Sequence, residues 1–309
     1  RRAMTRAPID RRALGRALTR LANADVAQVL AGAAARTDAV PRVGITGPPG
    51  AGKSSLAGRL GVLRARTRRV GVLAIDPSSP RTGGAILGDR IRMDEIEGAD
   101  QLYVRSLASR SAGDGLAENI PELLHAMDSA GFDEVLLETV GVGQAEHAVR
   151  HQVDTLVLVL NPESGDVVQA MKAGLMELAD LYVVNKCDLP GAARLAGEIA
   201  RVLALSPTGR DGWVPPVLQT SIRDAASIES LSAHVDRHLE WAARRASASQ
   251  RRAERARYRL RNLLERRVSE VTAALDAAVL EAPLDEQFAL ALAALAPAGP
   301  PAPAGGHHR

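Results

Sequence analysis

The chain has 309 residues, of which 46% are hydrophobic and only 2% aromatic, and its formal net charge is +3. This length suits one α/β domain with helical additions or two small domains, and the charge is too small to indicate nucleic-acid binding. The single cysteine, Cys187, excludes an intramolecular disulfide and fits a reducing compartment, so we expect a cytoplasmic location. No apolar run is long enough to span a membrane, and no membrane partner is expected.

Two helices are predicted near the N-terminus. Apolar residues recur at helical spacing between Ile9 and Arg36, and Asn23 or Asp25 could cap a second helix within this range. Residues 1–20 are rich in arginine and poor in acids. This composition is compatible with a transit peptide, but we favour a plain basic helix.

Seven short apolar runs predict seven β-strands. Several runs are continuous Val, Leu and Ile, which is typical of strands buried on both faces. Because predicted helices lie between most of them, we expect a mostly parallel, helix-flanked sheet with its ligands at the carboxyl ends of the strands. The predicted strands are Arg42–Thr46, Val70–Ile75, Leu102–Arg105, Glu134–Leu137, Thr155–Leu160, Leu181–Asn185 and Val217–Thr220, and the intervening helices include Leu116–Ala130, Asp166–Leu178 and Ala192–Leu205.

The first strand leads into a glycine-rich phosphate-binding motif, Gly47-Pro48-Pro49-Gly50-Ala51-Gly52-Lys53-Ser54, and Ser55 continues into a helix-forming run. A strand, a glycine-rich turn, Lys-Ser and a helix form a P-loop in its required context. The glycines let backbone N–H groups turn toward phosphate oxygens, and the helix N-terminus adds partial positive charge. Lys53 is predicted to contact the outer phosphates, and the Ser54 hydroxyl is predicted to bind Mg²⁺.

Acidic residues follow two further strands. The second strand ends at Asp76, and a loop rich in Gly, Ser and Pro leads on to Asp89. Carboxylates near a triphosphate are tolerable through Mg²⁺, although Asp76 could instead cap a turn and Asp89 could be an ordinary surface acid. The fourth strand ends at Glu138, with Gly141 three residues later. This is the Walker B and switch position, where GTPases usually carry Asp; the acid holds the water shell of Mg²⁺ and the Gly141 N–H senses a γ-phosphate.

A guanine-specificity motif, Asn185-Lys186-Cys187-Asp188, follows the sixth strand. The Asp188 carboxylate can accept both N1–H and the 2-amino group of guanine, whereas adenine offers neither donor. Lys186 is predicted to lie over the base, and Asn185 is predicted to tie this loop to the P-loop. In Thr220-Ser221-Ile222, after the last strand, a backbone N–H is expected to meet the guanine carbonyl oxygen.

The C-terminal part is predicted to be helical, with one or two long helices over His234–Ala278 and a shorter one over Leu284–Leu295. Between Arg244 and Arg267 lie ten arginines and two glutamates. No aromatic series accompanies them, so we interpret this stretch as a solvated or partner-docking helix face and expect no nucleic-acid partner. His147 and His151 are one helical turn apart, but without a clear third ligand we predict no zinc or nickel site.

Taken together, these motifs resemble those of the MeaB family, the methylmalonyl-CoA mutase-associated GTPases formerly described as arginine/ornithine transport kinases. The resemblance runs from about Ile9 to the arginine-rich helix. The motifs that carry it are the P-loop, Asp76-Pro77-Ser78-Ser79-Pro80, Thr82-Gly83-Gly84-Ala85-Ile86-Leu87-Gly88-Asp89-Arg90, Arg92-Met93, Glu138-Thr139-Val140-Gly141-Val142-Gly143-Gln144 and Asn185-Lys186-Cys187-Asp188.

The resemblance implies a P-loop GTPase that binds GTP, GDP and Mg²⁺. It implies a chaperone of an adenosylcobalamin-dependent acyl-CoA mutase, which gates cofactor delivery and protects or reactivates the mutase. It also implies a homodimer and admits a cobalamin adenosyltransferase as a second partner. The implied catalytic residues are Lys53, Asp89, Glu138 and Lys172, and the implied metal-site residues are Ser54, Asp76, Asp89 and Glu138. Lys172 falls in an additional switch of the family, together with Gly165, Asp166 and Gln169.

The expected organisation is an N-terminal helical extension (1–38), a P-loop G domain (39–240), a C-terminal helical dimerisation arm (241–296) and a disordered tail (297–309). The chain departs from the family pattern at Arg110–Leu116, at Glu146–His151 and at Asn161–Val167, where the family usually reads Pro-Gly-x-Gly-Asp-Glu. These stretches are expected to move or to touch the partner.

Two other functions remain open at this point. A metallochaperone GTPase for nickel or cobalt insertion would need a Cys/His metal site, and the single cysteine lies inside the guanine motif. A small-molecule kinase would need an acceptor pocket with a general base near the γ-phosphate, and no motif indicates one.

Overall fold

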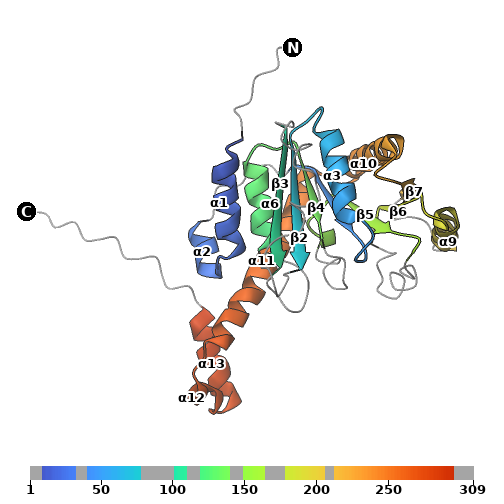
Figure 1. The fold of residues 1–309 in the computed structure, drawn as a ribbon. Helices are drawn as coiled ribbons and strands as arrows, with labels where there is room; N and C mark the ends of the chain where they lie inside the picture. Colours follow the sequence, from blue (N-terminus) through green and yellow to red (C-terminus); the bar gives the residue numbers. More distant parts are fainter. Residues whose placement is uncertain are drawn as a thin grey trace, which may run out of the picture. The chain divides into compact units, whose positions relative to one another are not determined.

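The computed structural model describes residues 9–32, 40–77, 101–109, 119–139, 149–163, 178–205 and 212–295. The chain divides into two compact units (Figure 1). The first comprises residues 1–23 and 35–255, and the second comprises residues 24–34 and 256–309.

The first unit is built on a seven-stranded sheet whose paired strands are all parallel within the described residues, in the order β3-β2-β4-β1-β5-β6-β7. The predicted parallel sheet is therefore confirmed. β2 and β3 extend beyond the predicted apolar runs, because they stay paired from Val70 and Leu102 to Pro77 and Ser109. The strands are β1 (Arg42–Thr46), β2 (Val70–Pro77), β3 (Leu102–Ser109), β4 (Glu134–Glu138), β5 (Thr155–Leu160), β6 (Leu181–Asn185) and β7 (Val217–Thr220).

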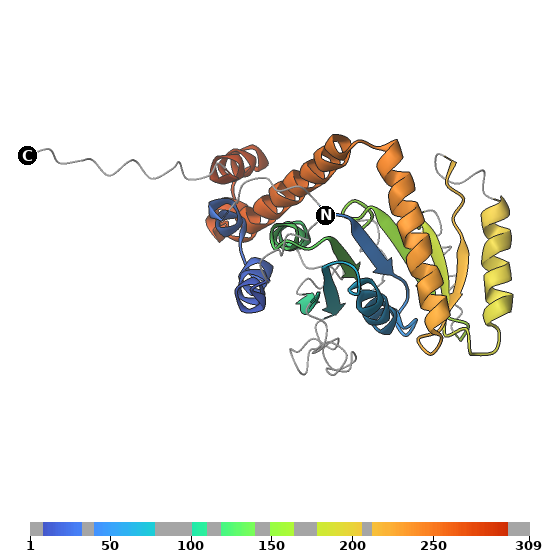
Figure 2. The ribbon, with the colours of Figure 1, turned by 90° about the horizontal axis from the view of Figure 1, so that it is seen from above.

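Helices cover both faces of this sheet (Figures 1 and 2). α3 (Lys53–Arg64) and α10 (Ala225–Arg245) pack on one face, and α1 (Arg11–Ala22), α6 (Ile120–Ser129) and α9 (Ala192–Leu205) pack on the other. Alternate residues of β5 serve the two faces: Val157 and Val159 join the cluster beneath α3 and α10, whereas Leu158 and Leu160 join the cluster beneath α9. Burial on both faces explains the continuous apolar runs.

The predicted start of the long C-terminal helix at His234 is wrong, because α10 begins at Ala225. Asp224 caps the helix, and its side chain accepts a hydrogen bond from the Ala226 N–H at 3.1 Å. The first turns of α10 bury Ile228 and Leu231 against the sheet. The cap and this apolar pair set the start of the helix.

The second unit contains α2 (Val26–Ala31), α12 (Ala277–Leu280), α13 (Leu284–Leu295) and the part of α11 (Ala248–Ala273) from residue 256 onward. Asp25 and Gln28 form a capping box at the start of α2, so the second of the two predicted caps is the one used. Val26 and Val29 of α2 pack against Leu263 of α11. No described helix is both long and apolar enough to cross a bilayer.

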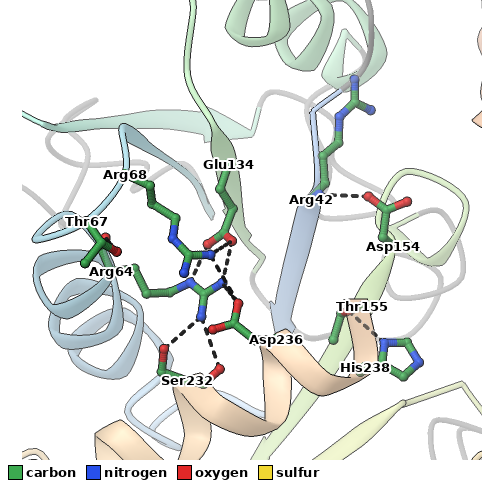
Figure 3. A network of polar contacts seen from close by, with 10 residues as sticks. All are labelled: Arg42, Arg64, Thr67, Arg68, Glu134, Asp154, Thr155, Ser232, Asp236 and His238. Carbon is green, nitrogen blue, oxygen red and sulfur yellow. Dashed lines mark hydrogen bonds and ion pairs between the residues drawn. The ribbon is translucent and has the colours of Figure 1, made fainter. Parts of the chain in front are cut away.

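A buried ion-pair network joins α3, β4 and α10 in the first unit (Figure 3). The Arg64 guanidinium donates two hydrogen bonds to the Glu134 carboxylate, at 2.6 and 2.5 Å, and Arg64 Nη2 lies 2.7 Å from Asp236 Oδ1. Burial by itself would lower the pKa of Arg64, but the hydrogen bonds and charge of Glu134, and then those of Asp236, outweigh burial and raise this pKa. Arg64 therefore stays charged and anchors the last turn of α3.

We expect Arg64→Ala to lower the free energy of unfolding by about 3–5 kcal/mol, because it leaves the buried Glu134 side chain without its main partner. Urea denaturation followed by far-UV circular dichroism measures this loss. The matched control is Arg194→Ala, which removes an exposed ion pair with Glu198 on α9 and should change stability by less than about 0.5 kcal/mol. A loss from Arg64→Ala as small as that of the control would show that the network does not anchor α3.

Candidate nucleotide-binding site

The P-loop lies directly over the carboxyl ends of the central strands. Gly47 has a φ of 141°, and a Cβ at this position would come within 2.0 Å of the Val159 carbonyl oxygen in β5. Gly52 has a φ of 85°, and a Cβ there would lie 2.5 Å from the Asn185 amide nitrogen. The predicted need for glycine therefore has two causes, a backbone turn and a close approach to neighbouring strands.

Lys53 and Ser54 open α3 behind this loop. The Lys53 side chain is buried, and its ammonium donates to the Pro48 carbonyl oxygen at 2.9 Å, which holds it within the curve of the P-loop. The Ser54 hydroxyl donates to Glu138 Oε1 at 2.5 Å. Two residues that the sequence predicts for Mg²⁺, 84 positions apart, thus meet at one point. A hydroxyl and a carboxylate are hard oxygen donors of the kind that Mg²⁺ prefers.

The guanine motif is tied to the P-loop by Asn185, as the sequence predicts. Its side-chain N–H donates to the Ala51 carbonyl oxygen at 2.9 Å, and its Oδ1 accepts from the Thr220 hydroxyl at 3.1 Å. The Cys187 N–H donates to the Thr220 carbonyl oxygen at 3.0 Å. Asn185 and Thr220 therefore join the loops that follow β1, β6 and β7 into one edge.

Asp188 is held at this edge as an anion. Its Oδ1 accepts from the Ser221 hydroxyl at 2.7 Å, and Arg223 Nη1 lies 3.5 Å from its Oδ2. The hydrogen bond from Ser221 is the largest cause of a lowered pKa for Asp188, to which the positive charges of Arg223 and Lys186 add. An ionised carboxylate can accept two hydrogen bonds from one base edge.

The third predicted motif, Thr220-Ser221-Ile222, is only partly available to a base. The Ser221 N–H already donates to the Ser227 hydroxyl at 3.1 Å. Ser221 contributes its hydroxyl to Asp188 instead, a role that the sequence does not predict.

Several predicted residues lie outside the described residues, namely Asp89, Gly141, Gln144, His147, Gly165, Asp166, Gln169 and Lys172. The backbone of Asp76 is described at the end of β2, but its side chain is not. Within the residues that are described, no three His, Cys, Asp or Glu side chains are placed to hold a metal ion together.

Sequence reasoning missed three contributors to this edge. Asn161 and Glu163 follow β5, and Arg223 follows β7. Asn161 donates to the Gly50 carbonyl oxygen at 3.1 Å, and Glu163 Oε2 lies 3.3 Å from Lys186 Nζ. Asn161 and Glu163 lie in the divergent stretch Asn161–Val167 that the sequence analysis singles out, and Arg223 directly follows Thr220-Ser221-Ile222, but the sequence does not predict these contacts.

The chain is similar in sequence to named relatives and similar in fold to a solved structure. A protein named as a GTPase in Pyrococcus abyssi is 42% identical over 226 residues, which span 72% of this chain and 69% of that relative. A Caenorhabditis elegans protein named methylmalonic aciduria type A homolog, mitochondrial, is 39% identical over 201 residues, 63% of this chain and 50% of the relative. The crystal structure of an LAO/AO transport system kinase has the same fold, with a TM-score of 0.61, 24% identity and coverage of 92% of this chain and 93% of that one.

The family model described as methylmalonyl-CoA mutase-associated GTPase MeaB matches residues 13–277. This match includes the P-loop, the end of β4 and the guanine motif. The chain belongs to the MeaB family of P-loop GTPases, which are GTP-hydrolysing enzymes.

Proposed function

We propose that this GTPase requires Mg²⁺ and serves an adenosylcobalamin-dependent acyl-CoA mutase of the methylmalonyl-CoA mutase type. In this role it gates delivery of the cofactor and protects or reactivates the mutase. The observation that carries the proposal is the match of residues 13–277 to a family described as mutase-associated. The Caenorhabditis elegans relative, whose name refers to methylmalonic aciduria, adds support. A cobalamin adenosyltransferase is a further proposed partner.

Phosphate and Mg²⁺ would be held between the P-loop and the end of β4. Residues 47–55 would surround the phosphates, and the backbone N–H groups of this loop, which Pro48 and Pro49 lack, would bind the phosphate oxygens. Lys53 would exchange the Pro48 carbonyl oxygen for phosphate oxygens. Bound Mg²⁺ would neutralise charge on the outer phosphates. Ser54 and Glu138 would hold it, directly or through water, together with Asp76 and Asp89, and Gly141 would sense the γ-phosphate. Glu138, Asp89 and Lys172 are the proposed catalytic partners of Lys53.

Guanine would be read by the loops after β6 and β7. Asp188, already ionised and oriented by Ser221, would accept the N1–H and the 2-amino group. Lys186 would cover the base. Because the Ser221 N–H is directed to Ser227, the Ile222 N–H is the better candidate donor to the guanine carbonyl oxygen.

The second unit carries two stripes of exposed apolar residues. Leu260, Leu264 and Val268 recur every four residues on α11 and are between 45% and 60% exposed. On α13, Leu284, Phe288 and Leu292 show the same spacing and are between 52% and 79% exposed. Apolar stripes of this kind match those of helices that pair with another helix, and we propose that a second copy of the chain covers them.

The partner proposal predicts that an adenosylcobalamin-dependent acyl-CoA mutase binds this protein and changes its rate of GTP hydrolysis. The measurement is phosphate release with and without each candidate mutase, with complex formation followed by size-exclusion chromatography. Lys53→Ala should abolish hydrolysis with and without the partner, which controls for contaminating activity. If no candidate mutase binds or changes the rate, the partner proposal is wrong and the GTPase assignment still stands.

The base-recognition proposal predicts that Asp188→Asn weakens GTP binding by about 10- to 100-fold, because two charge-assisted hydrogen bonds are lost. Xanthosine triphosphate should bind the variant better than it binds the native protein, since its 2-oxo group can accept from the new amide. Calorimetry with GTP and with xanthosine triphosphate measures this change in nucleotide preference. Asp224→Asn, which alters the α10 cap, is the matched control, and equal weakening by both variants would contradict the assignment.

The dimer proposal predicts that Leu264→Asp converts the protein to a monomer, because burying an unpaired carboxylate in an apolar interface is unfavourable. Sedimentation equilibrium gives the mass directly. Glu254→Asp, on α11 but within the first unit, should leave the mass unchanged. A native protein that sediments as a monomer, or a variant that remains a dimer, would contradict this surface assignment.

A further inference from the structure

The turn after β5 touches both nucleotide loops. Asn161 is buried, and its side-chain N–H donates to the Gly50 carbonyl oxygen of the P-loop at 3.1 Å. Its side-chain oxygen accepts from the Glu163 N–H at 2.9 Å. The Glu163 backbone is therefore fixed relative to the P-loop, and its side chain extends from this fixed position.

That partner is the lysine of the guanine motif. Glu163 Oε2 lies 3.3 Å from Lys186 Nζ, and the two side chains are 61% and 38% exposed. Both belong to the first unit, and they come from loops that follow adjacent strands, β5 and β6. The turn thus spans from the phosphate end of the site to the base end.

The backbone of Lys186 shows that its position is imposed by the surroundings. Its φ of 56° makes it the one non-glycine residue with a positive φ among the residues that the structure describes. Such a conformation persists where neighbouring contacts hold it. Here the Leu189 N–H donates to the Lys186 carbonyl oxygen at 2.9 Å, and the following Cys187 N–H is bonded to Thr220. These contacts fix the backbone of Lys186 and leave its long side chain to be ordered by Glu163.

We propose that Glu163 is a positioning residue for guanine recognition, which holds the Lys186 side chain extended over the place of the base. This inference rests on the proposed guanine site. A free lysine side chain loses considerable rotamer entropy when it is immobilised by a ligand. Because the pair with Glu163 already orders Lys186 before the nucleotide arrives, that loss is smaller on binding.

Glu163 could also affect nucleotide affinity in the opposite direction, by weakening binding. A carboxylate near the site of a nucleotide repels phosphate through space, and its removal would then strengthen binding. A probe that has phosphates but no base separates these effects. Magnesium pyrophosphate fills the P-loop without reaching Lys186, so it reports the through-space repulsion alone.

The test is Glu163→Gln, with dissociation constants of GDP and pyrophosphate measured by calorimetry in the presence of Mg²⁺. Since exposed ion pairs contribute little, we expect GDP to bind about two- to fivefold more weakly, with no weakening for pyrophosphate. The difference in GDP affinity between Glu163→Gln and the native protein should decrease at high salt, because salt screens the ion pair. In a Lys186→Met background, Glu163→Gln should cause no further loss of GDP affinity. Glu198→Gln, which breaks the exposed Arg194–Glu198 pair on α9, is the matched control and should change neither affinity.

Three results would overturn the inference. GDP affinity in Glu163→Gln could be unchanged or higher, GDP and pyrophosphate could weaken equally, or the loss could persist when Lys186 is absent. The proposed function fails separately: if the native protein binds ADP as tightly as GDP, the guanine site itself is wrong and the role of Glu163 fails with it. If the native protein prefers GDP and Glu163→Gln binds it normally, only the role of Glu163 is wrong.

Discussion

The close approach between the P-loop and the ends of β5 and β6 is the constraint on which this site depends. Gly47 passes so near the Val159 carbonyl oxygen that no side chain fits, and Asn185 bonds to the Ala51 carbonyl oxygen from the other side. The P-loop and the loop that carries the guanine motif are therefore parts of one packed edge. A P-loop held by this packing is pre-organised, which lowers the ordering needed when a nucleotide binds.

The C-terminal end of α3 is also held by contacts with the rest of the fold. Arg64 in its last turn is locked to Glu134 of β4 and Asp236 of α10, while Ser54 in its first turn meets Glu138 at the other end of β4. The helix that follows the P-loop is thus fixed to the same strand at both ends. β4 begins at Glu134 and ends at Glu138. Glu134 pairs with Arg64 and stabilises the fold, whereas Glu138 contacts Ser54 at the candidate site.

The predicted domain boundaries and the two compact units divide the chain differently. One compact unit combines residues 24–34 with residues 256–309. They group together because α2 packs on Leu263 and the Arg266 guanidinium donates to the Ala24 carbonyl oxygen at 2.9 Å. Some arginines of the basic stretch also have structural partners. Arg255 Nη2 lies 2.8 Å from Asp154 Oδ2, and Arg251 Nη1 donates to the Ala246 carbonyl oxygen at 2.5 Å. The sequence predicts a solvated or partner-docking helix face here, whereas the structure shows that Arg251 and Arg255 pair with groups of the fold itself.

The sequence by itself determined the strand order along the chain, the parallel sheet, the P-loop and the guanine motif, because each depends on local spacing of apolar residues, glycines or polar side chains. It also placed Glu138 and Asn185 correctly at strand ends. Only the tertiary structure decided that Ser221 and Arg223 orient Asp188, that Asn161 and Glu163 join the site, and that Arg64 needs Glu134 and Asp236. These partners lie up to 172 positions apart, and no local periodicity encodes which distant polar residues a fold will bring together.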